Sequence, residues 1–381
     1  LYKKKNLKNE IVEYNDYIKM LDDLYNNVID GAIVPGNYDT LFRNEVGFEN
    51  IVYDTKVIYE YSEKRQNEDL NIVSDKDFSE PLTFLFLGVD SEGDGLNANA
   101  AFNGDTLMLM SFNPKTLSSV LLSIPRDTYV PIACNNNRYA KINSSAAYGT
   151  GCVISTINKF LDINIDYYVK INFKGVVDLV EAVGGVEVDV EAPTYMANAY
   201  GGKVCEQNSD RQWGDKLVCI NPGLQVLNGE QALAYARIRH ATGGDYKRTE
   251  RQRLVLKKTA DKLKQQDLAT LNKIIDKVMP EVSTSFTTKE ILSLATGAFD
   301  YELGETTGFP FDLETPEQIP GYSGSYVIPK GLEENVIKLH QFLYPNKDYT
   351  PTATVTDISN TLNDMTNVYP NTTESGTSQN E

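Results

Sequence analysis

Hydrophobic and polar positions alternate in blocks from residue 82 onward, and these blocks predict strands and helices in turn. The run LTFLFLGVD at 82–90 is almost continuously apolar, which is typical of a strand buried on both faces. TLMLMSF and LSSVLLSI follow it, separated by the turn sequence NPKT, and predict an antiparallel hairpin. Helical runs at 152–163 and 174–183 then alternate with strand-like runs at 165–173 and 186–190. This alternation predicts an α/β fold, with a mixed central β-sheet and helices on both faces.

The two ends of the chain have a different pattern. Residues 8–30 carry apolar side chains at spacings of three and four, which predicts an amphipathic helix that needs a partner to cover it. The polar run SEKRQNEDLN then separates residues 1–78, predicted to be a small accessory or spacer region, from a main domain at 79–348. The rest, 349–381, is rich in Thr, Asn, Ser and Asp and is predicted to be a disordered tail.

Composition narrows the classes of partner. With 381 residues and 41% apolar content the chain can bury a large core. A formal net charge of -17 argues against a nucleic-acid partner and against a polybasic membrane patch, so any anion site must be a local exception. The chain contains no run of about 18 apolar residues. It begins at Leu1 without a methionine, and the lysines of LYKKKNLKNE would suit the flank of a membrane anchor lying upstream.

The four cysteines form two local pairs in the sequence, Cys134 with Cys152 and Cys205 with Cys219, and no CxxC spacing occurs. Disulfides are the favoured interpretation, with the local pairing favoured by proximity, and they would place the protein in an oxidising, extracytoplasmic compartment. Four free buried thiols are the alternative. The segment between Cys205 and Cys219 is rich in Gly, Asn and Asp and is predicted to be irregular.

Charged residues follow the ends of the predicted strands. Asp90 ends the first strand, Asp105 starts the second, and SIPRDTYV places Arg126 after the third. If the three strands pair as a hairpin, these groups meet at one edge of the sheet. Two facing carboxylates would repel each other, so a divalent cation such as Mg²⁺ is a natural third party. Aspartates at strand ends also serve simply as turn and capping residues.

A second cluster of charge lies in LNGEQALAYARIRHATGGDYKRTERQR, where five arginines fall between residues 237 and 253 of an acidic chain. Arg237 and Arg239 share a face only if the chain is extended there, so the preceding helix must end near Ala236 for both to hold one anion. Arg248 and Gln252 are four apart and stack on one face of the next helix. A core-facing helix gives the same pattern as a lipid-binding one.

Several separated motifs, taken in order, strongly resemble the LytR-CpsA-Psr family of bacterial envelope proteins. They are FLGVD, GDTLMLMSFNP, SIPRDTYV, KIN, INFKGVVDLVEAVGGVEV and the arginine-rich block. The resemblance runs from about residue 80 to 345. It implies a membrane-anchored, extracytoplasmic phosphotransferase that moves a glycopolymer, such as teichoic acid or capsule, from a polyprenyl-pyrophosphate carrier to peptidoglycan with the help of Mg²⁺.

The resemblance also assigns roles to individual residues. Asp90 and Asp105 match the magnesium-binding and catalytic aspartates, and Arg126 matches the catalytic arginine that faces the pyrophosphate. The remaining pyrophosphate contacts match Arg237, Arg239, Arg248 and Gln252. Where the family commonly has an arginine, this chain has Asn103, which can donate a hydrogen bond but carries no charge.

Three further expectations complete the picture. Asp127 is expected to orient an arginine, a site aspartate to act as the base for an acceptor hydroxyl, and His240 and His340 to be packing or surface residues. Attack on a phosphoryl group needs no covalent enzyme intermediate, since cations stabilise the charge that develops. A polyprenyl-pyrophosphate pyrophosphatase, or a non-catalytic scaffold that binds the lipid or the wall polymer, remains an alternative function.

Overall fold

The computed structural model describes most of the chain between residues 17 and 370. The described ranges are 17–34, 50–58, 81–89, 104–113, 116–191, 203–210, 214–238, 244–286, 302–316, 318–320 and 322–370, with the single residues 12, 14, 48, 96 and 102. Within them no helix is long and apolar enough to cross a membrane.

A six-stranded mixed sheet forms the centre of the molecule, in the order β11-β6-β1-β2-β3-β12. Its strands are β1 (Leu82–Val89), β2 (Gly104–Asn113), β3 (Ser118–Ile124), β6 (Tyr167–Asn172), β11 (Val282–Thr284) and β12 (Glu302–Gly308). β1, β2 and β3 pair antiparallel, as the hairpin prediction required, whereas β6 runs parallel to β1 and β12 parallel to β3. The predicted α/β class is therefore confirmed.

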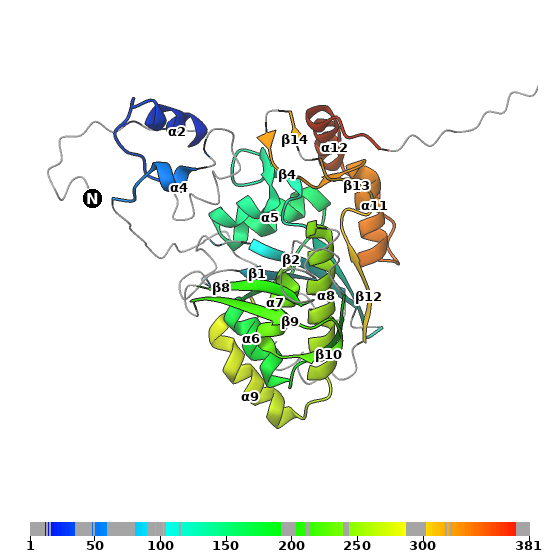
Figure 1. Ribbon diagram of the computed structural model, residues 1–381. Helices are drawn as coiled ribbons and strands as arrows, with labels where there is room; N and C mark the ends of the chain where they lie inside the picture. The colour runs from blue at the N-terminus through cyan, green and yellow to red at the C-terminus, as the bar shows by residue number, and fades with distance from the viewer. Residues whose placement is uncertain are drawn as a thin grey trace, which may run out of the picture.

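Helices cover both faces of this sheet (Figure 1). The helices in contact with the upper face in this view are α5 (Thr150–Leu161), α11 (Leu332–Leu343) and α12 (Ala353–Thr366). Below the sheet lie α6 (Phe173–Ala182), α7 (Gly229–Arg237), α8 (Gly244–Leu263) and α9 (Leu268–Val278). Five leucines of the central strands point into the core cluster above the sheet and are only 0–2% exposed, namely Leu85, Leu87, Leu107, Leu109 and Leu122. They alternate along their strands with residues of the opposite face.

The remaining elements sit around these layers. They are α2 (Tyr17–Tyr25), α4 (Ile51–Asp54), β4 (Tyr129–Ile132), β5 (Arg138–Lys141), the 3-10 helix η2 (Ile142–Tyr148), β7 (Val186–Val190), β10 (Gly223–Leu227), the 3-10 helix η3 (Met279–Glu281), β13 (Leu313–Glu314), β14 (Gln318–Ile319), β15 (Tyr322–Ser323) and β16 (Ile328–Pro329). In the accessory region, Leu21 of α2 packs with Phe48 and Ile51 in a small cluster of its own. The part of the predicted stripe that lies on this helix, at Ile18, Leu21 and Tyr25, is thus at least partly covered, whereas Val28 is 66% exposed and the helix is shorter than the predicted 8–30.

The prediction of a disordered tail from residue 349 was wrong for the part of it that the structure describes. Residues 353–366 form α12, and its Val355, Ile358 and Leu362 are 0–5% exposed in the same cluster as the upper face of the sheet. Three apolar residues at spacings of three and four are enough to dock a helix whose other positions are polar. Residues 371–381 lie outside the described residues.

The segment from Cys205 to Cys219 is also more regular than predicted. It forms a hairpin of β8 (Val204–Asp210) and β9 (Gly214–Ile220), in which the two cysteines are directly opposite each other and joined by a disulfide. Its side chains are mostly polar, so the strand pattern is faint in the sequence, and the backbone ladder and the bridge define the structure. Val204, Val218 and Ile220 pack in a cluster with Tyr235 of α7.

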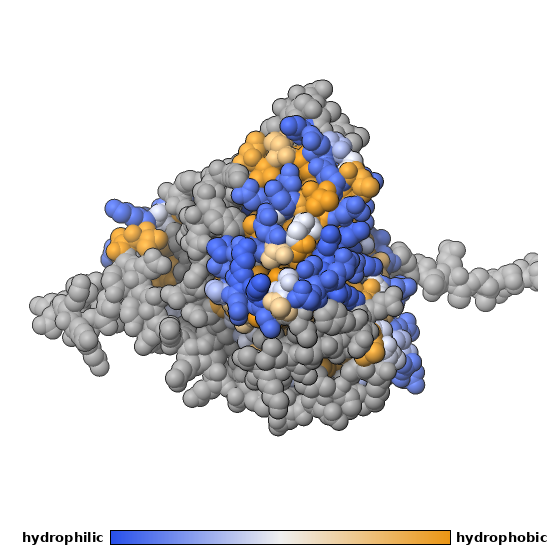
Figure 2. Space-filling view, turned by 90° about the horizontal axis from the view of Figure 1, so that it is seen from below, coloured by the Kyte–Doolittle hydropathy of each residue, from blue (hydrophilic) through white to orange (hydrophobic). Residues whose placement is uncertain are grey.

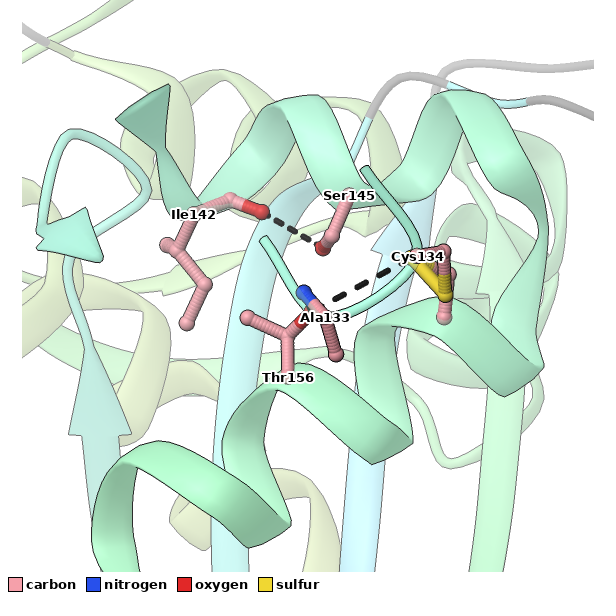
Figure 3. Close-up of a disulfide and its surroundings, with 6 residues drawn as sticks. Ala133, Cys134, Ile142, Ser145 and Thr156 are labelled. Atoms are coloured by element: carbon pink, nitrogen blue, oxygen red, sulfur yellow. Dashed lines mark hydrogen bonds between the residues drawn. A yellow bond between two sulfur atoms is a disulfide. The ribbon is translucent and has the colours of Figure 1, made fainter. Parts of the chain in front are cut away.

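The other disulfide, Cys134 to Cys152, joins the segment after β4 to the first turn of α5 (Figure 3). Beside it the Ala133 backbone N–H donates to the Thr156 hydroxyl at 3.2 Å, a second tie between the same two elements. The predicted local pairing of all four cysteines is confirmed, and the described part of the chain has no free thiol.

Candidate active site at the edge of the sheet

Arg126 and Asp105 form an ion pair at one edge of the central sheet. The Arg126 Nη1 donates to Asp105 Oδ1 at 2.6 Å, and both side chains are about one fifth exposed, at 22% and 20%. Asp105 is the second residue of β2 and Arg126 follows the end of β3 in a turn, in which the Thr128 N–H donates to the Pro125 carbonyl at 3.1 Å. The hairpin therefore brings these two predicted residues together, as expected.

Asp90, Asn103, Arg239 and His240 lie outside the described residues, so their predicted positions remain predictions. Of their neighbours, Val89 pairs with Gly104 in the β1–β2 ladder, next to Asp105.

Asp127 contacts two cations beside the ion pair. Its Oδ1 lies 3.2 Å from Lys141 Nζ, in the KIN motif, and 3.9 Å from Arg126 Nε. Asp127 therefore lies within ion-pair distance of Arg126, but Lys141 is the nearer cation. The Asn143 N–H donates to the Arg126 carbonyl at 3.2 Å, so the KIN segment also holds the backbone of Arg126.

Arg237 is the last residue of α7. This helix starts with a capping box between Asn228 and Gln231 and ends where Ile238 becomes extended, at a ψ of 119°. For Arg237 and Arg239 to hold one anion, the helix was predicted to end near Ala236. It ends at Arg237, one residue later. The Arg237 guanidinium stacks over the Phe173 ring, 4.5 Å from its centroid.

Arg248 and Gln252 lie on one side of α8, as their spacing predicts. Arg248 is only 2% exposed, and the Gln252 Oε1 is buried without a hydrogen-bond partner in the described parts of the chain. The same side of the helix continues to Val255, which packs in the cluster below the sheet. The helix is therefore core-facing at Val255, and lipid binding near its polar beginning stays a prediction.

Lys170 is a buried cation that the sequence analysis did not single out. It lies on β6 opposite Leu87 of β1, is 0% exposed, and places its Nζ 4.6 Å from the centroid of the Phe102 ring. Burial lowers the pKa of Lys170 to about 7. A lysine in the middle of the apolar run YYVKIN was the signal in the sequence.

The two faces of the sheet differ in how completely they are covered. On the lower face, apolar residues of interior strands stay partly exposed, namely Phe86, Met110, Val169 and Ile171. Each of these strands has a neighbouring strand on both sides. These side chains are therefore partly exposed on the face of the sheet that the lower helices cover, and not at its edges. In the view from below, the coloured part of the surface is largely hydrophilic, with apolar patches among the polar residues (Figure 2).

His340 is a packing residue, as predicted. Its ring stacks on Tyr349 with centroids 3.5 Å apart, and its Nε2 lies 3.0 Å from the Leu161 carbonyl oxygen. Burial lowers the pKa of His340, which favours the neutral ring.

The sequence model of the LytR_cpsA_psr family matches residues 49–303, well over half of the chain. The chain belongs to the LytR_cpsA_psr family. The match begins inside the region predicted to be accessory, and it confirms the resemblance seen in the motifs.

Relatives in the family are named as wall-polymer transferases. The polyisoprenyl-teichoic acid–peptidoglycan teichoic acid transferase TagV of Bacillus subtilis strain 168 is 29% identical over 71% of this chain and 66% of its own length. TagU of the same strain, which carries the same description, is 35% identical over 52% of this chain and 57% of its own length. This chain thus spans between half and two thirds of the curated relatives it matches most strongly.

Solved structures of the family share the fold. The crystal structure of B. subtilis TagV matches 72% of this chain and 99% of its own with a TM-score of 0.56 and 29% identity. A structure described as TagT bound to LI-WTA matches 71% of this chain and 94% of its own, with a TM-score of 0.53 and 27% identity.

Proposed function

We propose that this protein is a phosphotransferase that moves a glycopolymer from a polyprenyl-pyrophosphate carrier to peptidoglycan. The observation that carries the proposal is the position of Arg126 and Asp105 at the sheet edge, combined with a partly uncovered apolar face of the same sheet. A lipid pyrophosphate has both a multiply charged head and a long apolar tail. The names of TagV and TagU, relatives of this chain, agree with this substrate class.

The cationic groups suit the charged end of such a donor. Arg126 follows β3, whereas Arg237 and Arg248 lie on the consecutive helices α7 and α8, far from it in the sequence. We propose that they bind the pyrophosphate together with Arg239, Gln252 and Asn103. Guanidinium groups bind phosphate oxygens through paired hydrogen bonds. During transfer they would stabilise the charge that develops on the nonbridging and leaving oxygens.

The lower face of the sheet suits the prenyl tail. Phe86, Met110, Val169 and Ile171 offer partly exposed apolar surface in the interior of the fold, where burial of a hydrocarbon chain would stabilise the complex. The upper face is covered more completely by α5, α11 and α12, since its Leu85, Leu87, Leu107, Leu109 and Leu122 are 0–2% exposed and, among its described apolar strand residues, Val120 is the one that stays partly exposed.

Asp105, with Asp90, is the proposed site for Mg²⁺. Mg²⁺ is commonly held by one or two carboxylates plus phosphate oxygens and water, which suits a site formed by two aspartates and a pyrophosphate. When bound, the ion would neutralise charge on the phosphate oxygens. Asp105 also accepts the hydrogen bond from Arg126, so it couples the metal site to the arginine.

The two disulfides support an extracytoplasmic location, since such bonds persist in oxidising compartments. We propose that the protein acts at the outer face of the cytoplasmic membrane.

The test is a transfer assay with purified protein, a lipid-linked glycopolymer, peptidoglycan and Mg²⁺. We expect polymer attached to peptidoglycan, with loss of transfer in Arg126→Ala and no loss in Lys338→Ala, a control that removes an exposed cation from α11. Release of phosphate without any acceptor would favour a pyrophosphatase instead. Lipid binding with no turnover, or wild-type transfer by Arg126→Ala, would refute the proposed enzyme.

A further inference from the structure

Arg253 is a buried arginine on α8 that none of the roles above uses. It is 6% exposed, and its Nη1 donates a hydrogen bond to the hydroxyl of Ser123 on β3. Ser123 lies three residues before Arg126, and Arg253 directly follows Gln252. The contact therefore joins the two segments that carry the proposed anion-binding residues.

The surroundings of Arg253 are shaped to hold its side chain. Gly308 of β12 pairs with Ser123, and a Cβ atom at Gly308 would lie 3.2 Å from the Tyr246 ring and 3.5 Å from Arg253 Nη1. The absence of a side chain at Gly308 thus leaves room for the guanidinium beside the strand. The Phe309 N–H donates to the Ser123 carbonyl at 2.8 Å, so the backbone around this hydroxyl is also fixed.

The guanidinium of Arg253 forms no ion pair with a carboxylate of the described residues. Among the residues that the structure describes, no carboxylate oxygen lies within 4 Å of its guanidinium, and its Nε is buried without a hydrogen-bond partner. Glu250, one turn earlier, pairs with Lys247 at 2.8 Å. By contrast, Arg251 on the same helix has Glu191 at 3.7 Å. Burial lowers the pKa of Arg253, and the Coulombic effects of Tyr246 and of the Glu250 carboxylate offset only part of this shift.

A tether alone would not need this charge. A glutamine could donate a hydrogen bond to Ser123 without the desolvation cost of a buried cation. A bound anion would offset that cost, and the proposed pyrophosphate contacts begin at Arg248, five residues earlier and about 7.5 Å along the helix axis.

We propose that Arg253 is a positioning residue for the anion site, which fixes the first half of α8 against the end of β3 through Ser123 and adds, behind the bound pyrophosphate, a positive charge that forms no ion pair with a described carboxylate. The inference rests on the proposed function in that it takes the ligand to be a pyrophosphate. At a separation of about 10 Å and an effective dielectric constant of about 20, one such charge changes anion affinity roughly tenfold.

The experiment is isothermal titration calorimetry of inorganic pyrophosphate with MgCl2, on the whole protein. We expect Arg253→Gln, which keeps a donor for Ser123 but not the charge, to bind about tenfold more weakly, with a shallower dependence on salt. Arg253→Lys should stay within about threefold of the wild type, because it restores the charge. Ser123→Ala keeps the charge and loses the tether, so its loss should also be about threefold.

Lys258→Gln is the matched control, since it removes one charge from a less buried position on the same helix, and we expect it to bind like the wild type. The charge role is overturned if Arg253→Gln binds pyrophosphate with wild-type affinity. It is also overturned if Arg253→Gln loses no more affinity than Lys258→Gln, or no more than Ser123→Ala. If Arg253→Gln does not fold, Arg253→Met combined with Ser123→Ala replaces it. A wild-type protein that fails to bind pyrophosphate would refute the proposed function instead.

Discussion

The buried amine of Lys170 makes the stability of the protein depend on pH in a defined window. Its pKa is about 7 in the folded state and 10.5 for the unperturbed side chain, so between these values the unfolded chain binds more protons. Stability must therefore rise with pH across this window, and it is lowest where the buried amine is charged. For these two pKa values, the free energy of unfolding should increase by about 2 kcal/mol between pH 7 and pH 9 through this group alone.

Lys170→Met isolates this contribution from that of every other group. Urea unfolding of both proteins at pH 7, 8 and 9 gives the difference in free energy, which we expect to shrink as pH rises, with the variant the more stable at pH 7. Lys338→Met, at an exposed position, should follow the pH dependence of the wild type. If Lys170→Met and the wild type have parallel stability curves, the amine of Lys170 is not desolvated in the way described.

Three other predictions test the fold and the site. Leu362→Ala should lower the free energy of unfolding by about 3 kcal/mol in urea titrations, whereas Asn360→Ala on the exposed side of α12 should change it by less than about 0.5 kcal/mol; equal effects would mean that α12 does not dock. Arg126→Lys should lower polymer transfer at least about tenfold at unchanged melting temperature, since an ammonium cannot replace the guanidinium fork, and unaltered transfer would contradict this role. Opening the second disulfide with Cys205→Ser and Cys219→Ser should cost about 3 kcal/mol, a difference that must vanish when both proteins are unfolded under reducing conditions.

The predicted hairpin illustrates what local pattern could establish. The apolar runs around Leu85, Leu109 and Leu122 and the turn between the last two required three antiparallel strands, and this pairing alone placed Asp105 beside Arg126. Local spacing likewise placed Arg248 and Gln252 on one side of a helix. The motifs that resemble the family are of the same kind, because each is a short run read in order along the chain.

The predictions for the tail and for the segment between Cys205 and Cys219 were wrong because few apolar side chains stabilise the structure there. α12 docks through three apolar residues among polar ones, and composition averaged over the tail concealed them. The hairpin β8–β9 is held by its backbone ladder and by the bridge between Cys205 and Cys219, neither of which depends on an apolar alternation. Lys170 was overlooked although it interrupts the apolar run YYVKIN, because a strand can also turn such a lysine to solvent and only the packing of the sheet decides that its amine is buried.

The sequence by itself determined the class of fold, the hairpin, both cysteine pairings and the family, since all of these follow from patterns over short stretches of chain. The tertiary structure alone decided which face of the sheet is filled, which cations are buried, and which of them have a carboxylate nearby. These properties depend on packing between segments far apart in the sequence, such as Ser123 with Arg253, and no spacing along the chain encodes them.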